Sequence, residues 1–254
     1  MIITDNPYRL DIKEDNYRHC LDRFDVSDYA PYAFSAAMTF DVIPRLHRGK
    51  MNGFFASVFS EHFFGMLSVY DEEAQCCFGL VFGADAILSR FCEALSSLKA
   101  LCLEPGYCLL STAATFNAYH NYRLTVTSHL IARVEKRTRY SSWDNIAHVT
   151  ADEPLSDLSA QMSGIATSLA ANRRLTKMAD EILRSIDGQS TLADGGIPWC
   201  PDHMHAINQK FHSHICIIKR RVAVQQVHIE LLLAQVQNQL TAVSIEGVCC
   251  GFRN

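Results

Sequence analysis

Apolar residues recur at steps of three and four along the C-terminal part of the chain, and this is its clearest pattern. The first stripe consists of Leu158, Met162, Ile165, Leu169, Asn172, Thr176, Ala179, Leu183 and Ile186. The second consists of Ile207, Phe211, Ile218, Val222, Ile229, Leu232 or Leu233, Val236, Leu240 and Val243. Such spacing keeps one seam of a helix facing a partner, as in a coiled coil. The pattern predicts two long helices that form an antiparallel pair.

The ends of these helices follow from the turn residues between them. Asp187 and Gly188 predict the end of the first helix, and residues 193–201, with Gly195 and Gly196, predict a loop. Asp202 is a good N-cap for the second helix. Unbroken to Ile245, that helix would span about 65 Å, so we expect part of it to lie against another helix, against another copy of the chain, or free. Residues 247–254 lack the period and predict an irregular tail.

Two polar residues, Asn172 and Thr176, interrupt the first stripe. A buried asparagine at a seam position fixes the register of the paired helices at some cost in stability. We interpret both residues as determinants of packing specificity, with a ligand-binding role as the alternative.

The N-terminal part mixes helix and strand signals. Residues 15–25 predict a short helix, and two apolar runs between Gly53 and Gly83 fit two strands of a small sheet, although the first run fits a buried helix equally well. Helices are predicted over residues 84–103 and 110–139, the second with the apolar face Phe116, Tyr119, Leu124, Ile131 and Val134. The fold class is mainly α, with the long antiparallel C-terminal helix pair packed on a smaller α+β N-terminal region. The regions are 1–105 (α+β), 106–246 (helical) and 247–254 (irregular tail).

Composition limits the classes of partner. The chain has 254 residues, 48% of them hydrophobic, and a formal net charge of -4, so we expect a folded core and no nucleic-acid partner. We expect no membrane span, because residues 51–70 contain Glu61 and His62, and residues 76–91 contain Asp85 and Arg90. The acidic N-terminal residues do not fit a signal peptide, so the expected location is cytoplasmic and the ten cysteines are expected to be reduced, as buried apolar residues or inert thiols.

Candidate chemistry is sparse. Asp202, His203, His205, His212 and His214 suggest a metal cluster, but two residues separated by two helical positions point about 200 degrees apart. Only a non-helical start near Pro201 would let His203 and His205 share an ion. The metal-binding residues therefore stay unknown, no cofactor is expected, and no nucleophile or phosphate-loop motif identifies a catalytic residue. The basic cluster of Arg133, Lys136, Arg137 and Arg139 predicts a solvated helix end, with an anionic lipid or phosphate contact as the alternative.

A resemblance rests on the seam from Leu158 to Ile186, the Gly195-Gly196 loop, Arg220-Arg221-Val222, and the run Gln235-Val236-Gln237-Asn238-Gln239-Leu240-Thr241, with further likeness at Pro105 to Leu110, His120, Tyr122, Val134 and Glu135. Over roughly residues 60 to 245 the chain resembles the soluble part of fungal CorA-like proteins, relatives of divalent-cation transporters. In that family the long helix leads toward two membrane spans, and a Gly-Met-Asn loop follows the first span in true magnesium channels. Here Met51-Asn52-Gly53 lies in the wrong context to replace that loop. The resemblance implies a transporter-related cytosolic part without the membrane pore.

Three functions are consistent with these patterns. The first is a noncatalytic helical protein that forms a homo-oligomer through its long helices. The second is a helical small-molecule-binding or accessory protein of a biosynthetic pathway, with a pocket between the Phe-rich segment and the helices. The third is a metal-dependent enzyme that uses His203 and His205.

Overall fold

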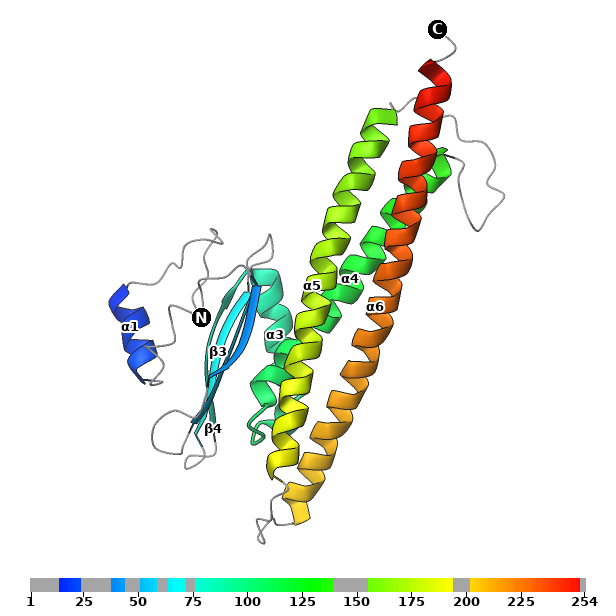
Figure 1. Ribbon diagram of the computed structural model, residues 1–254. Coiled ribbons are helices and arrows are strands. Elements are labelled where there is room, and N and C mark those ends of the chain that lie inside the picture. The colour runs from blue at the N-terminus through cyan, green and yellow to red at the C-terminus, as the bar shows by residue number, and fades with distance from the viewer. Residues whose placement is uncertain are drawn as a thin grey trace. The chain divides into compact units, whose positions relative to one another are not determined.

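The structure is a computed structural model that describes residues 14–23, 38–43, 51–58, 64–71, 76–138, 155–193 and 202–251. In chain order the elements are α1 (Glu14–Arg23), β1 (Met38–Ile43), β2 (Met51–Val58), β3 (Phe64–Asp71), β4 (Cys76–Gly83), α3 (Asp85–Ser97), the 3-10 helix η2 (Lys99–Leu101), α4 (Tyr107–Thr138), α5 (Leu155–Ala193) and α6 (Asp202–Gly251) (Figure 1). The chain forms two compact units, one of Met1–Asn117 with Met178–Arg220 and one of Ala118–Lys177 with Arg221–Asn254. Every described strand precedes residue 105, whereas α4, α5 and α6 follow it.

The first unit contains a four-stranded antiparallel sheet with the strand order β1-β2-β3-β4. Its β3 strand is buried on both faces from Phe64 to Tyr70, so its sequence lacks the alternation of a half-exposed strand. This explains why periodicity could not separate strand from helix over residues 54–69. The helix alternative was wrong, and the run expected as one strand contains β2 and β3. The prediction also omitted β1.

Two helices of the first unit cover one face of this sheet (Figure 1). The ring of Phe64 on β3 lies 5.5 Å from that of Phe91 on α3 and 5.4 Å from that of Phe116 on α4. Buried aromatic pairs at these separations stabilise packing beyond the area they bury. The hydroxyl of Tyr70 donates a hydrogen bond of 3.4 Å to the carbonyl oxygen of Leu103. The sheet, α3 and the first turns of α4 therefore share one core.

The predicted antiparallel helix pair is α5 and α6. In the first unit Asp187 of α5 contacts Lys219 of α6, and in the second unit Arg173 of α5 contacts Glu230 of α6. Lower numbers on α5 thus pair with higher numbers on α6, as antiparallel helices require. Every residue of the predicted α5 stripe is buried, with exposed fractions between 0% and 7%. The mainly helical fold class with its smaller α+β region is confirmed.

Helix ends differ from the sequence expectation in two places. α5 continues past Gly188 to Ala193, and α6 continues past Ile245 to Gly251 in place of the irregular tail expected from residue 247. A glycine inside a helix costs only about 1 kcal/mol relative to alanine, which a long hydrogen-bonded helix tolerates. α6 begins at Asp202 as expected, whereas the predicted loop lies almost wholly in residues 194–201, outside the described part.

The second unit has a three-helix core formed by parts of α4, α5 and α6. Its apolar residues are Leu124, Ile131, Val134, Leu158, Met162, Ile165, Leu169, Ile229, Leu232, Val236 and Val243. Polar residues are buried beside them. The side chain of Asn172 is 1% exposed, and neither its amide nitrogen nor its oxygen has a hydrogen-bond partner. His120 is fully buried, and both of its ring nitrogens are likewise unpartnered.

Candidate functional site

Of the histidines considered as metal ligands, His212 and His214 have described side chains and belong to no metal cluster among the described residues, whereas the side chains of His203 and His205 lie outside the described part. The backbone is helical from Asp202 onward, so the non-helical start that His203 and His205 would need is not observed. No group of three or more His, Cys, Asp or Glu side chains suitable for a metal ion occurs among the described residues.

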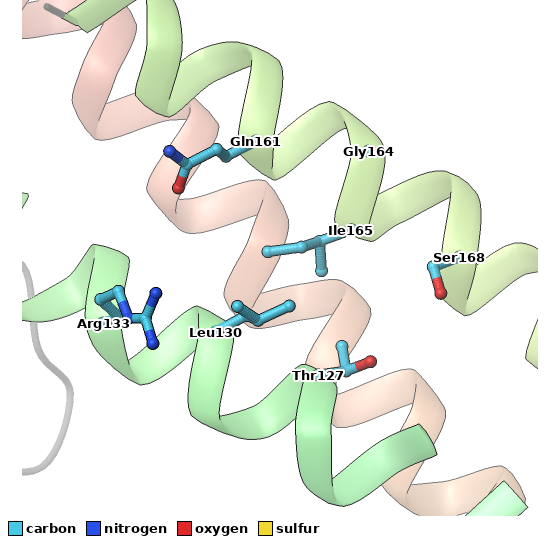
Figure 2. A pocket seen from close by; sticks show the side chains of 7 residues that line it. All are labelled: Thr127, Leu130, Arg133, Gln161, Gly164, Ile165 and Ser168. Atoms are coloured by element: carbon cyan, nitrogen blue, oxygen red, sulfur yellow. The ribbon is translucent and has the colours of Figure 1, made fainter.

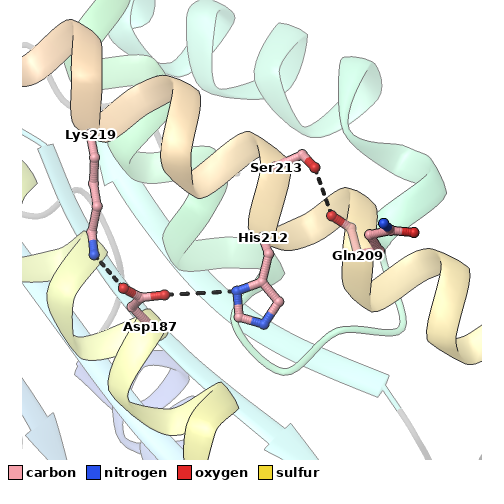
Figure 3. Close-up of polar contacts among 5 residues, drawn as sticks. All are labelled: Asp187, Gln209, His212, Ser213 and Lys219. Atoms are coloured by element: carbon pink, nitrogen blue, oxygen red, sulfur yellow. Dashed lines mark hydrogen bonds and ion pairs between the residues drawn. The ribbon is translucent and has the colours of Figure 1, made fainter.

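His212 instead belongs to an ion-pair cluster on α5 and α6 in the first unit (Figure 3). Its Nδ1 atom lies 3.7 Å from Oδ1 of Asp187, and the ammonium group of Lys219 donates a hydrogen bond to Oδ2 of the same carboxylate. Ser213 hydrogen-bonds to the backbone oxygen of Gln209 one turn earlier on α6. Asp187 and Lys219 remain 43% and 30% exposed, and pairs with such exposure contribute little to stability. The cluster holds two helices together and shows no catalytic arrangement.

The described members of the basic cluster, Arg133 and Lys136, have exposed side chains. Arg133 borders a cavity of about 420 Å³ between α4 and α5 in the second unit (Figure 2). The other residues that line it are Thr127, Leu130, Gln161, Gly164, Ile165 and Ser168. One cation and a few neutral polar groups line this cavity beside Leu130 and Ile165.

A second cavity, which we call the cysteine pocket, lies in the first unit between the sheet and the helices. It has a volume of about 450 Å³ and is lined by Met66, Cys77, Gly79, Val81, Phe91, Leu95, Cys102, Leu103, Tyr107 and Cys108. The volume falls in the usual range for small-molecule sites, and apolar walls with a few polar groups are typical of them. This is the region where the sequence predicted a pocket, between the Phe-rich segment and the helices.

The strand register explains why the pocket is open. Cys77 pairs with Tyr70 across β3 and β4, and Gly79 pairs with Ser68. Paired residues place their side chains on the same face, and Gly79 has none to fill the space opposite Ser68. A Cβ atom at Gly79 would meet only the Leu67 carbonyl oxygen, at 3.7 Å. The first turn of α4 supplies Cys108 to the pocket.

Two thiols interact inside this pocket. The Cys77 thiol contacts the Pro105 carbonyl oxygen at 3.7 Å and hydrogen-bonds to the side chain of Cys108. The hydrogen bond from Cys77 has the largest effect and lowers the pKa of Cys108. Burial raises this pKa, and a hydrogen bond from Ser68 lowers it, so that the pKa is about 7. Two donors thus stabilise the thiolate enough to outweigh its desolvation.

Tyr107 lies beside the same sulfur atoms. Its hydroxyl donates a hydrogen bond of 2.5 Å to the Leu95 carbonyl oxygen. Burial is the largest cause that raises the pKa of Tyr107, and the neighbouring Cys108, Cys102 and Cys77 raise it further. The phenol therefore stays neutral at ordinary pH. It can donate a proton but cannot act as a base.

The sequence analysis missed this thiol cluster. Among the cysteines whose side chains the structure describes, Cys92, Cys102 and Cys216 are exposed and Cys77 and Cys108 are half-buried. Of the two expected alternatives, the fully buried apolar residue therefore does not hold for these five, and the inert thiol stays a prediction. None of the five is in a disulfide. The pairing of Cys77 with Cys108 joins a strand to a helix 31 positions later, and no short motif marks such a contact.

An exposed apolar surface lies on α6 in the second unit. Val224, Val227 and Leu231, which we call the α6 stripe, are 65%, 71% and 51% exposed. They follow one another at steps of three and four, which places them on one face of the helix. Ile217, seven residues before Val224 on the same helix, is also 50% exposed. Runs of exposed apolar residues of this kind mark interaction surfaces.

None of the described helices combines the length and the apolar character that crossing a lipid bilayer requires. Comparisons of the chain with protein-family models, with curated proteins and with solved structures found no match.

Proposed function

We propose that this chain is a noncatalytic helical protein that associates with a second copy of itself along the α6 stripe. The observation that carries this proposal is the exposure of Val224, Val227 and Leu231 on one face of a long helix. Moving a valine or leucine side chain from water into an apolar contact stabilises an assembly by about 1.5–3 kcal/mol per residue. The neighbouring positions Ala223 and Ala234 are exposed and small, so a second helix can approach the stripe closely.

Charge favours an antiparallel arrangement of the two α6 helices. Arg220 and Arg221 lie at one end of the α6 stripe and Glu230 lies toward the other, and all three are exposed. A parallel pair would place each arginine beside its own copy, which is unfavourable. An antiparallel pair that sets Val224 against Val227 of the partner subunit separates the arginines of the two copies by about 14–17 Å along the helix axis. Glu230 keeps its contact with Arg173, at 3.0 Å in its own chain.

The resemblance of the helix pair to CorA-like proteins supports a wider role for this assembly. We propose that the chain corresponds to the cytosolic part of a CorA-like, metal-ion-transport-related protein and that it works in the cytoplasm. The support is the seam from Leu158 to Ile186 and the run from Arg220 to Thr241. In this proposal the protein acts by association and transports no ion through the described helices.

Sedimentation velocity tests the self-association directly. We expect the wild-type chain to be a dimer at micromolar concentration and Val227→Glu to be a monomer with an unchanged helix content. Val126→Glu is the matched control, because Val126 is an exposed valine (41%) on α4, and this variant should remain a dimer. A monomeric wild-type chain, or equal loss of dimer in both variants, would contradict the proposal.

A charge deletion tests the antiparallel orientation. The double variant Arg220→Gln with Arg221→Gln should change the affinity of an antiparallel dimer little, because the arginines of the two copies lie far apart along the axis. In a parallel dimer the same variant should strengthen the association several-fold, because it removes a contact between like charges. Several-fold tighter association of the double variant would therefore exclude the antiparallel register.

The cysteine pocket favours a second candidate function, the binding of a small apolar molecule. Its volume and its apolar walls support this role. The test is the fluorescence of an anilinonaphthalene dye added to the protein, with Gly79→Leu as the variant that fills the pocket. Ala170→Leu, at an exposed position of α5 that lines neither cavity, is the control. Dye binding by a monomer that Gly79→Leu abolishes would support ligand binding. Equal fluorescence in all variants would exclude it.

A further inference from the structure

The two hydrogen-bonded thiols of the cysteine pocket form a unit that neither self-association nor ligand binding explains. Cys77 is on β4 and Cys108 is in the first turn of α4, and both sulfur atoms face one cavity. Both side chains are half-buried, so a small reagent can reach them through the pocket. Cys77 and Cys108 thus line one cavity from two different elements, as the two members of a disulfide could.

We propose that Cys77 and Cys108 are a dithiol pair that reduces a hydroperoxide and becomes a disulfide. In the first step the Cys108 thiolate attacks one peroxide oxygen, the O–O bond breaks, and the other oxygen takes a proton from water and leaves as an alcohol or water. Cys108 is then a sulfenic acid. In the second step the Cys77 sulfur attacks the Cys108 sulfur, the S–O bond breaks, and the hydroxide leaves with the Cys77 proton as water. Two thiols are oxidised and one hydroperoxide is reduced.

The surroundings assign different roles to the two sulfur atoms. Cys108 receives hydrogen bonds from Cys77 and Ser68, which lower its pKa to about 7, so about half of it is thiolate at pH 7. The attacking sulfur must be a thiolate. Cys77 contacts carbonyl oxygens of the α3–α4 connection, at 3.7 Å for Pro105 and 4.0 Å for Glu104. Cys77 can donate its proton to these oxygens or to Cys108, and it gives that proton to the departing hydroxide as its sulfur attacks the sulfenic acid.

Thiol labelling measures the reactivity of Cys108. At pH 7 the thiolate fraction of Cys108 is about sixteen times that of an ordinary thiol with a pKa of about 8.5. A more acidic thiolate is also a weaker nucleophile, which lowers the labelling rate by about fivefold. We therefore expect iodoacetamide to modify Cys108 about threefold faster than Cys92, which is exposed and outside the pocket. Labelling of Cys108 slower than that of Cys92 would contradict its role as the attacking sulfur.

Two substitutions at Cys77 separate its two roles. Cys77→Ser keeps a hydroxyl donor beside Cys108, so labelling of Cys108 should remain fast although no disulfide can form. Cys77→Ala removes the donor, so labelling should slow severalfold. Circular dichroism of both variants controls for folding. Equal labelling rates in Cys77→Ser and Cys77→Ala would show that the hydrogen bond does not activate Cys108.

Peptide mapping after treatment with one equivalent of hydrogen peroxide tests the disulfide itself. We expect a Cys77–Cys108 linked peptide in the wild-type chain that dithiothreitol removes. Cys102→Ser and Cys92→Ser should give the same linked peptide, and Cys77→Ser should give Cys108 sulfenic acid, which dimedone traps. Absence of the linked peptide in the wild-type chain, or its loss in Cys102→Ser, would overturn the proposal. None of these readouts depends on the oligomeric state, so the result is distinguishable from that of the α6 stripe.

Discussion

The hydroxyl of Thr138 on α4 donates a hydrogen bond of 2.6 Å to Oε1 of Gln239 on α6, and the two residues are only 4% and 2% exposed. They lie 101 positions apart in the sequence. A buried side-chain pair at this distance ties two helices of the second unit in one register.

A double-mutant cycle measures the interaction energy between Thr138 and Gln239. Thr138→Val and Gln239→Leu should each lower the free energy of unfolding by about 0.5–1.5 kcal/mol, because each removes the buried hydrogen bond between the two helices. The double variant should lose clearly less than the sum of the two, since it removes both polar groups. Urea denaturation of the four proteins provides the values. Strict additivity would show that the two side chains do not interact.

The buried His120 should make stability depend on pH. Burial, together with a smaller effect of the Arg123 charge, lowers the pKa of His120 to about 4, whereas an unfolded histidine has a pKa of about 6.5. Between these values the unfolded state binds the proton and the folded state does not, so stability falls as pH falls from about 6.5 to about 4. The loss should total about 3 kcal/mol.

The measurement is the urea midpoint across this pH range. His120→Leu should flatten the dependence, because no group remains to protonate on unfolding. His129→Gln, at an exposed position of the same helix, is the control and should keep the wild-type slope. A His120→Leu profile as steep as the wild type would refute the assignment.

Substitution by alanine should have opposite effects on stability at two glycines. A Cβ atom at Gly106 would lie 2.8 Å from Cγ2 of Ile186 and 2.8 Å from Cζ of Phe211, whereas at Gly164 it would meet no atom within 4 Å. Gly106→Ala should therefore destabilise the protein by about 1–3 kcal/mol through overpacking. Gly164→Ala should stabilise it by about 0.5–1 kcal/mol through helix propensity. Thermal unfolding of both variants checks the two signs, and a stabilising Gly106→Ala would contradict the packing at that turn.

Asn172 should be replaceable by an apolar residue with a gain in stability. Both of its side-chain polar atoms are buried and unpartnered, so Asn172→Leu removes a desolvation penalty of about 1–3 kcal/mol. Thr176→Val is the control, because the Thr176 hydroxyl already bonds to the Asn172 carbonyl oxygen at 2.8 Å within its own helix, and it should change stability little. A loss of stability in Asn172→Leu would indicate a bound water or other partner at this site.

The helical part of the fold was predictable because its signal is local and repeated. The stripe from Leu158 to Ile186 predicted the buried face of α5 residue by residue. The Asn172 position also emerged from that stripe. The sheet was harder, since β3 is buried on both faces and its residues from Phe64 to Tyr70 show no alternation.

The candidate site was only partly predictable. A pocket between the Phe-rich segment and the helices followed from the order of the elements, and the cysteine pocket lies there. Its thiol pair did not follow, because the strand register sets Cys77 opposite Tyr70 and the α3–α4 connection then brings Cys108 to it. The α6 stripe was hidden for another reason. Val224 and Val227 are as apolar as their buried neighbour Val222, and only packing decides which face is covered.

The strand order β1-β2-β3-β4 has a consequence for how the chain acquires its structure. Each strand pairs with the next one along the chain, so the sheet closes only short loops, which is entropically inexpensive and fast. The Thr138–Gln239 contact must wait until almost the whole chain is available. On the ribosome we therefore expect the meander to pair before α6 has emerged, and the nascent helices to remain exposed to chaperones in the meantime.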